Sequence, residues 1–168
     1  MPEPRKGYDT MEVITVCFFG HRQLEHPAEA ERVLEETVRR LLREHDYVEF
    51  LVGRDGDFDI LASAVVKRCQ KEFRGDNSAL TWLLPYPTAD FRDNQASYEK
   101  YYDGIEIFQS NGHYKGAFQR RNRAMIDRSD LIVCCIEHEY GGAYQSVRYA
   151  KRIGKKVENV AYQEEDEG

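Results

Sequence analysis

The sequence lacks the long apolar stretches that mark membrane proteins. None of its apolar runs approaches the roughly 20 residues that a membrane-spanning helix needs. The first ten residues, which include Pro2, Pro4 and Arg5, also lack the apolar core of a signal peptide. We therefore expect a cytoplasmic protein with no membrane partner.

Cysteine is scarce and is not spaced for metal binding. The four cysteines are Cys17, Cys69, Cys134 and Cys135, and they contain no Cys-x-x-Cys pair. Cys17, Cys134 and Cys135 lie inside hydrophobic runs, where a thiol acts as a small apolar side chain. We expect buried cysteines, no metal site and no disulfide framework.

Several catalytic and cofactor motifs are also missing. The chain contains no Gly-x-Gly-x-x-Gly fingerprint, Walker loop, His-Glu-x-x-His pair or Gly-x-Ser-x-Gly nucleophile turn. These absences remove support for a dehydrogenase, a P-loop NTPase, a zinc protease or an esterase. No motif in the chain requires a cofactor.

A basic charge excess, the usual mark of nucleic-acid binding, is absent as well. The 168-residue chain has a formal net charge of −6, and Glu164, Glu165, Asp166 and Glu167 contribute four of the excess negative charges. This balance disfavours nucleic acid as a partner. We expect a flexible N-terminus over residues 1–10, one domain over 11–162 and an acidic disordered tail over 163–168.

What the chain does contain is an alternation of short apolar runs and amphipathic segments. Strands are predicted over residues 13–19, 48–52, 80–84, 131–136 and 157–160, with a weaker one over 105–108. Helices are predicted from Pro27, from an Asp57 cap, over 90–102, late in 110–128 and over 143–153. This order predicts a single Rossmann-like α/β domain with a mostly parallel sheet and helices on both faces.

Glycine turns follow three of the predicted strands. The carboxyl ends of parallel strands share one sheet edge, where α/β proteins bind ligands. Glycine lets backbone amides approach an anion, and a helix N-terminus adds its positive end. The candidate ligand-binding residues are Gly20, His21, Arg22, Gly53, Asp55, Gly56, Asp59, Arg121, Asn122, Gly141, Gly142 and Ala143.

Several candidate side chains have two readings that the sequence leaves open. Arg121 can grip phosphate or carboxylate, or lie on a solvated helix face. Asp59 can bind a ribose hydroxyl or stabilise a helix start, and His21 can contact ligand or cap a helix. An aromatic group can stack on a base or cover a core edge. That group comprises Tyr98, Tyr101 and Tyr102.

At these turns the sequence resembles the SLOG superfamily, and most closely its YpsA-like branch. The resembling segments are 17–22, 53–59, 121–130 and 141–143 with 149–150, in the expected order between about residues 13 and 160. The Gly-His-Arg and Arg-Asn-x-x-Met-x-Asp-x-Ser-Asp segments are the more specific ones. The resemblance implies a Rossmann-like fold and a nucleotide-related ligand.

Relatives in that superfamily include the LOG phosphoribohydrolases and the DNA-processing protein DprA. If Gly142-Ala143 matches the Gly-Thr step of the LOG motif, Ser146 stands at the catalytic glutamate position. Serine cannot supply a carboxylate, so LOG-type hydrolysis is disfavoured. Arg54 stands where many relatives carry glycine, and we expect it to narrow the phosphate pocket.

Three functional hypotheses follow. The leading one is a sensor or regulatory module that binds a nucleotide or a phosphate-containing nucleotide derivative. The alternative is a nucleotide N-glycosidase, or phosphoribohydrolase-like hydrolase, that uses Asp55, Asp57 or Asp59. A DprA-like role on DNA is the third, and the charge balance disfavours it. An exposed sheet edge or helix face is also compatible with a homodimer.

Overall fold

The computed structural model describes residues 11–73 and 75–163. The expected flexible N-terminus over residues 1–10 therefore lies outside the described residues. The same holds for the expected acidic tail, apart from Gln163.

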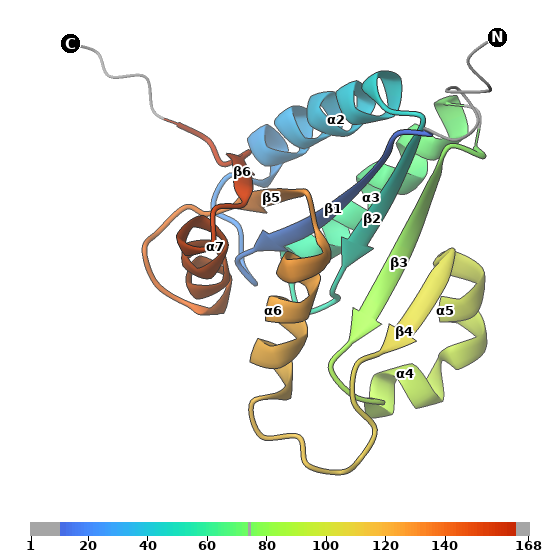
Figure 1. Ribbon diagram of the computed structural model, residues 1–168, viewed down its shortest axis with the longest axis vertical. Helices are drawn as coiled ribbons and strands as arrows, with labels where there is room; N and C mark the ends of the chain where they lie inside the picture. The colour runs from blue at the N-terminus through green and yellow to red at the C-terminus, as the bar shows by residue number, and fades with distance from the viewer. Residues whose placement is uncertain (1–10, 74, 164–168) are drawn as a thin grey trace, which may run out of the picture.

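The described chain forms one six-stranded sheet in which every pair of neighbouring strands is parallel (Figure 1). The strand order is β4-β3-β2-β1-β5-β6. The strands are β1 (Val13–Gly20), β2 (Tyr47–Val52), β3 (Ser78–Leu84), β4 (Gly104–Ile107), β5 (Leu131–Cys135) and β6 (Lys156–Asn159). The predicted mostly parallel sheet is confirmed, and so is the weaker strand expected over 105–108.

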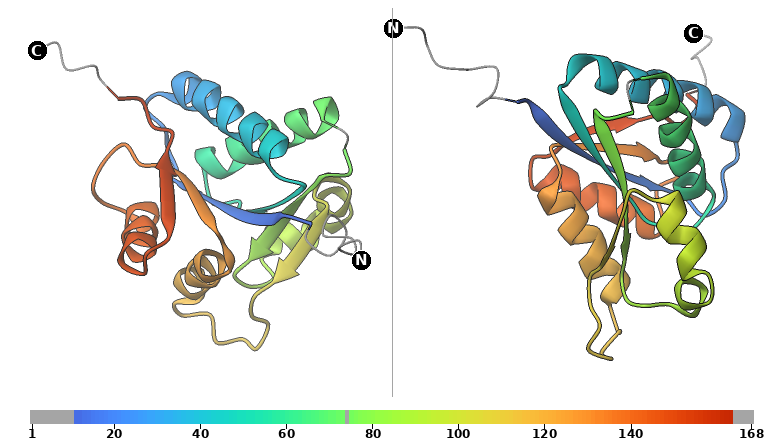
Figure 2. Two further views of the ribbon diagram at one scale, coloured as in Figure 1. Left: turned by 45° about the horizontal axis from the view of Figure 1, so that its top comes forward. Right: turned by 90° about the vertical axis from the view of Figure 1, so that its right-hand side faces the viewer.

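Helices cover both faces of this sheet, as predicted (Figure 2). One face carries α2 (Pro27–Glu44), α3 (Asp57–Glu72), α4 (Ala89–Asp93) and α5 (Gln95–Tyr101), and the other carries α6 (Ala117–Arg128) and α7 (Gly142–Arg152). Among the described residues, no helix combines the length and the apolar character needed to cross a bilayer. The fold is a single Rossmann-like α/β domain.

Each face of the sheet has its own hydrophobic core. Phe18 and Phe50 belong to the cluster under α2 and α3, whereas Cys17 and Ile132 belong to the cluster under α6 and α7. Consecutive residues of a strand point to opposite faces, so a strand covered on both sides is apolar throughout. The four cysteines are buried and unpaired. Burial raises the pKa of Cys17 to about 12, so its thiol stays protonated.

Two local expectations differ from the structure. Asp57 does not cap α3, because Gly56 is the N-cap and no side chain caps the helix. Instead Asp57 is the first helical residue, and its carboxylate accepts a hydrogen bond of 3.3 Å from the Leu24 amide. The helix predicted over 90–102 is two short helices that meet at Asn94, where the backbone leaves the helical conformation.

The strand order places a topological switch beside β1. From β1 the chain builds outward through β2, β3 and β4, and then returns to add β5 and β6 on the other side of β1. The connections therefore leave β1 and β5 toward opposite faces of the sheet. A crevice opens at such a point, at the carboxyl ends of the strands.

Candidate functional site

A cavity of about 710 Å³ lies at this switch point, above the carboxyl ends of β1, β2 and β5. The structure brings the three glycine turns together there. Eleven of the twelve candidate residues line the cavity, and they are Gly20, His21, Arg22, Gly53, Asp55, Asp59, Arg121, Asn122, Gly141, Gly142 and Ala143. The twelfth candidate, Gly56, is not among the lining residues.

Two of the glycines serve the packing of the protein itself. A Cβ atom on Gly20 would lie 2.3 Å from Cγ of Phe58, and one on Gly56 would lie 2.4 Å from Cα of Arg22. Both distances are far below van der Waals contact. These glycines therefore allow α3 to start against the end of β1, which brings Asp55 and Asp59 to the cavity.

The glycines at the start of α7, in contrast, do not pack closely against other parts of the protein. Gly141 has a φ of 97°, in the left-handed region, and no side chain caps the first turn of α7. A Cβ atom on Gly142 would meet nothing within 4 Å. Since Gly141, Gly142 and Ala143 all line the cavity, the uncapped helix N-terminus is open to an anion.

Arg121 is the central polar side chain of the site. It is only 1% exposed, and its guanidinium ion-pairs with Asp55 at 2.5 Å. A second N–H donates to the carbonyl oxygen of Leu83 at 2.9 Å, and Nε donates to Asn122 Oδ1 at 2.9 Å. The side chain also packs over the ring of Phe118, at 5.4 Å. Three of its N–H groups thus have protein acceptors, and one of these is the carboxylate of Asp55 on the floor of the cavity.

Asp59 lies on that floor and has an unusual pKa. Burial, followed by repulsion from Asp55, raises the pKa of Asp59 to about 7. Its Oδ2 accepts a hydrogen bond of 2.9 Å from the Asp55 amide. The two carboxyl groups therefore differ: Asp55 is paired with Arg121, while Asp59 gains or loses a proton near neutral pH.

We predict that Asp59→Asn changes the pH dependence of stability. The folded pKa of Asp59 exceeds that of an exposed aspartate, so its favourable contribution is complete below about pH 4 and is lost as the pH rises to about 7. The variant, which cannot ionise, should be more stable than the wild type at pH 8 and gain clearly less at pH 5. Urea unfolding at both pH values measures this. An equal effect at both pH values would contradict it.

Three rings stack on the opposite wall. The rings of His21 and His138 stack at 3.6 Å, and those of His138 and Tyr140 stack at 3.7 Å. His21 Nε2 accepts a hydrogen bond of 3.3 Å from the His138 amide. Burial, followed by His138, lowers the pKa of His21, so the imidazole is neutral near pH 7. Tyr140 is 67% exposed and ends the stack at the mouth of the cavity.

His138, Tyr140 and Phe118 also line the cavity, although they are not among the residues predicted from the sequence. His138 and Tyr140 follow β5, so the rule that ligand residues come directly after strands could have found them. Phe118 lies one turn before Arg121 on α6, and only the packing of the guanidinium on its ring reveals its place.

Arg54 and the tyrosine group are not among the residues that line the cavity. Arg54 donates a hydrogen bond of 3.1 Å to the Tyr102 hydroxyl and packs over the ring of Tyr98 at 4.9 Å. It points toward α5, so the expectation that it narrows the phosphate pocket is wrong. Tyr98 and Tyr102 pack on Trp82, with ring centroids 4.8 Å and 5.3 Å away. Of the two readings of the tyrosine group, covering a core edge is the one that these two residues follow.

Asn122 joins the two helices that border the cavity. Its Oδ1 accepts from Arg121, and its Nδ2 donates to Ser146 Oγ at 3.3 Å. Ser146 is buried on α7, at the position where the LOG motif would place glutamate. The serine therefore serves as a polar link between α6 and α7.

Comparison with known proteins shows a similarity in structure and none in sequence families. No family model matches the chain, and no curated protein matches its sequence. The chain shares its fold with DNA processing protein A. It superposes on the Helicobacter pylori protein, which has been studied for its single-stranded DNA binding mode, with a TM-score of 0.63 and 18% identity. For the Streptococcus pneumoniae protein the TM-score is 0.65 and the identity is 14%.

These superpositions cover 87% and 89% of this chain, but only 64% and 50% of the respective solved chains. The protein thus spans between half and two thirds of the length of its structural neighbours. At such low identity the likeness establishes a common Rossmann-like fold.

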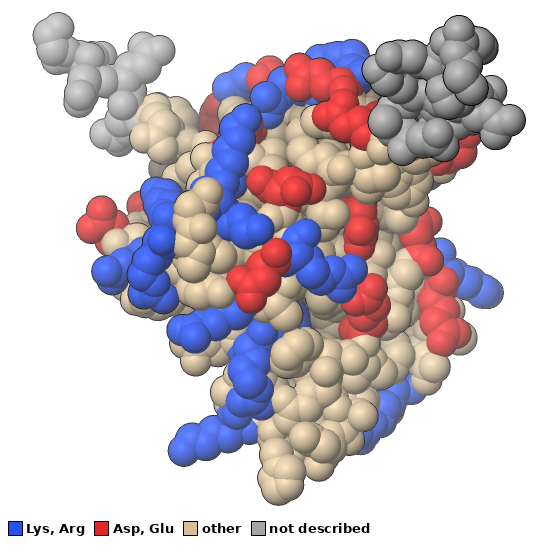
Figure 3. Space-filling model, in the orientation of Figure 1, with Lys and Arg blue, Asp and Glu red and all other residues tan. Residues whose placement is uncertain are grey.

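One expectation is overturned by this comparison. The acidic net charge disfavoured nucleic acid as a partner, and that conclusion is wrong, because the Helicobacter pylori protein, which shares this fold, binds single-stranded DNA. Net charge averages over the whole surface, whereas binding depends on local charge. Figure 3 shows Lys and Arg side chains gathered over α6 and α7 despite the overall acidity.

Proposed function

We propose that the cavity binds a nucleotide or a phosphate-containing nucleotide derivative, and that the protein acts as a sensor or regulatory module. One observation carries the proposal. The uncapped N-terminus of α7 opens into the same cavity as the acceptor pair Asp55 and Asp59 and the stacked rings of His138 and Tyr140. A nucleotide presents an anion, sugar hydroxyls and an aromatic base, and the cavity offers a chemically complementary group for each of them.

The expected pose follows from these walls. Phosphate lies at Gly141–Ala143, where backbone amides and the helix end favour negative charge. Phosphate is disfavoured on the floor near Asp55 and Asp59, because negative charge on carboxyl groups repels it, whereas sugar hydroxyls can donate to the carboxyl oxygens. The base stacks on the exposed face of Tyr140.

The comparisons support the proposal at the level of the fold, since a structural neighbour binds a nucleotide polymer. We also propose that the chain is a member of the SLOG superfamily, in its YpsA-like branch. The support is the order of its motifs and the meeting of their glycine turns in one cavity. A sensor needs no catalytic carboxylate at position 146, and Ser146 supplies none.

A pair of substitutions at Gly142 tests the proposal. Gly142→Asp adds a negative charge where phosphate is expected, in open space and at a helix start that tolerates aspartate. The nearly isosteric Gly142→Asn adds no charge. We expect the aspartate variant to bind nucleoside monophosphates at least about tenfold more weakly, and the asparagine variant to stay within a few-fold of wild type. Ligand-induced thermal stabilisation measures both.

Equal losses in the two variants would point to bulk rather than charge and would contradict the phosphate assignment. If a panel of nucleoside monophosphates fails to stabilise even the wild-type protein, the proposed function itself fails.

One observation favours the alternative function, which is a nucleotide hydrolase. Asp59, with a pKa of about 7, and Asp55, ion-paired with Arg121, form a pair of carboxyl groups in different environments, as acid catalysis of glycosidic cleavage requires. Release of free base from nucleoside monophosphates, lost in Asp59→Asn, is the activity that would establish this second function.

A further inference from the structure

A groove of about 510 Å³ runs between α6 and α7 and continues the cavity. The groove and the cavity share Phe118, Asn122 and Gly142 as lining residues. Gly142 begins α7, where the proposed phosphate lies, so the groove leads away from that phosphate along the helix. Its lining includes Arg123, Arg148 and Arg152, and none of its lining residues is an aspartate or a glutamate.

Each of these three arginines makes a cation–π contact with an aromatic ring. The guanidinium groups of Arg123 and Arg152 lie 5.0 Å and 5.6 Å from the ring centre of Tyr149. The Tyr149 hydroxyl donates to Asp127 at 2.6 Å, which fixes the ring. Arg148 lies 5.8 Å from the ring of Tyr144. A ring orients a guanidinium while leaving its N–H groups free for an anion.

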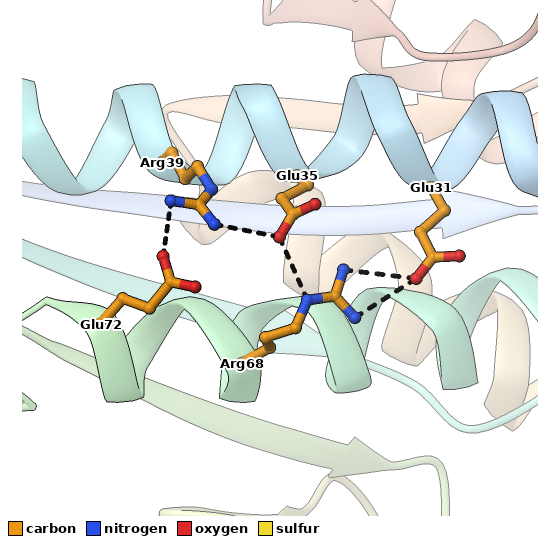
Figure 4. Close-up of polar contacts among 5 residues, drawn as sticks. All are labelled: Glu31, Glu35, Arg39, Arg68 and Glu72. Carbon is orange, nitrogen blue, oxygen red and sulfur yellow. Dashed lines mark hydrogen bonds and ion pairs between the residues drawn. The ribbon is translucent and has the colours of Figure 1, made fainter.

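On the other helix-covered face of the sheet, arginines are paired with glutamates. Between α2 and α3, Arg39 pairs with Glu35 and Glu72, and Arg68 pairs with Glu31 and Glu35 (Figure 4). These guanidinium groups are neutralised within the protein.

Within the part of the chain that the structure describes, no carboxylate lies at ion-pairing distance from Arg123, Arg148 or Arg152. All three are exposed. The uncompensated positive charge is thus concentrated along the groove, in the region where Figure 3 shows blue side chains over α6 and α7.

We propose that this groove carries the phosphodiester backbone of a single-stranded oligonucleotide, one nucleotide of which occupies the cavity. The inference rests on the proposed function and extends it from a mononucleotide to a strand. Arg148 and Arg152 are four residues apart on α7 and so lie on one helix face. Together with Arg123 from α6 they border a continuous path that starts at the phosphate site. Cations spaced along a groove suit the regularly spaced phosphates of a strand.

The test compares a fluorescent twelve-residue oligothymidylate with thymidine monophosphate on the wild type and on Arg148→Ala/Arg152→Ala. Losing two phosphate contacts on a single strand should weaken oligonucleotide binding about 25-fold at 0.1 M salt and reduce the salt slope by about 1.4. Binding of the monophosphate should stay within about twofold, because the strand contacts lie outside the cavity. Arg32→Ala is a control for a charge lost away from the groove, since it removes one exposed arginine from α2 and should change the binding of neither ligand.

The outcomes separate the two proposals. If the monophosphate binds but the oligonucleotide binds no tighter, or if the double variant binds the oligonucleotide as well as wild type does, the groove proposal is overturned and the proposed function stands. If neither ligand binds the wild-type protein, both fail. Displacement of the oligonucleotide by polyglutamate at an equal concentration of charges would indicate an acidic peptide partner instead and would also overturn the strand assignment. A circular dichroism melt of the double variant that matches wild type excludes misfolding.

Discussion

Replacing Arg121 with methionine is expected to lower the free energy of unfolding by about 3 kcal/mol, because breaking a buried ion pair leaves its partner uncompensated. Methionine keeps much of the volume, so the loss of charge dominates. Without the guanidinium, Asp55 loses its ion pair, the Leu83 carbonyl loses a donor, and the pKa of Asp59 rises further. Urea denaturation at pH 7 measures the effect.

A neighbouring arginine on the same helix is the control. Arg123→Met removes the same charge two positions away, from an exposed side chain whose contact is with the ring of Tyr149. It should change stability by less than about 0.5 kcal/mol. Asp55→Asn in the Arg121→Met background should recover part of the loss, since it removes the unpaired carboxylate. Equal stability of the two single variants would show that the Arg121 pair is not a support of the cavity floor.

Adding one methyl group at Gly20 is expected to cost about 2 to 3 kcal/mol of stability, because overpacking forces buried groups to move. The new Cβ would lie 2.3 Å from Phe58 Cγ, on a ring that is itself fully buried against Phe18. Relief requires α3 to shift away from β1, and that shift also displaces Asp59. Gly20→Ala should therefore lower the melting temperature by roughly 6 to 10 °C.

Gly142→Ala is the matched control for this prediction, because the same methyl group there meets no atom within 4 Å. Its melting temperature should stay within about 2 °C of wild type. The Phe58→Ala background should reduce the cost of Gly20→Ala in part, since it removes the clashing Cγ and Cδ2 atoms and leaves only the Phe58 Cβ atom near the new methyl group. A similar cost in both backgrounds would show that the Phe58 ring is not the source of the strain.

The two glycine variants also distinguish two structural roles of glycine. The sequence predicts the same role for all the candidate glycines, namely that a backbone without a side chain can approach an anion. In the structure Gly20 and Gly56 allow one part of the chain to approach another, whereas Gly142 faces open space. The pattern of glycine after strand is the same in each case, and the neighbour differs.

Much of the fold could be predicted from local patterns. Apolar runs such as residues 131–135 are continuous because both faces of a central strand are covered. The break at Asn94 and the N-cap of α3 at Gly56 were not predicted, since capping and helix termination depend on hydrogen bonds that the apolar spacing does not report. The position of the cavity followed from the rule for carboxyl ends of parallel strands.

The sequence by itself determined the parallel sheet and the edge at which the glycine turns gather, because both depend on periodicity and order along the chain. Only the tertiary structure decided the partners. Arg121 meets a carboxylate 66 positions away, whereas Arg148 and Arg152 meet rings and no carboxylate among the described residues. Electrostatic interactions depend on distance in space, which folding sets and which linear spacing does not encode.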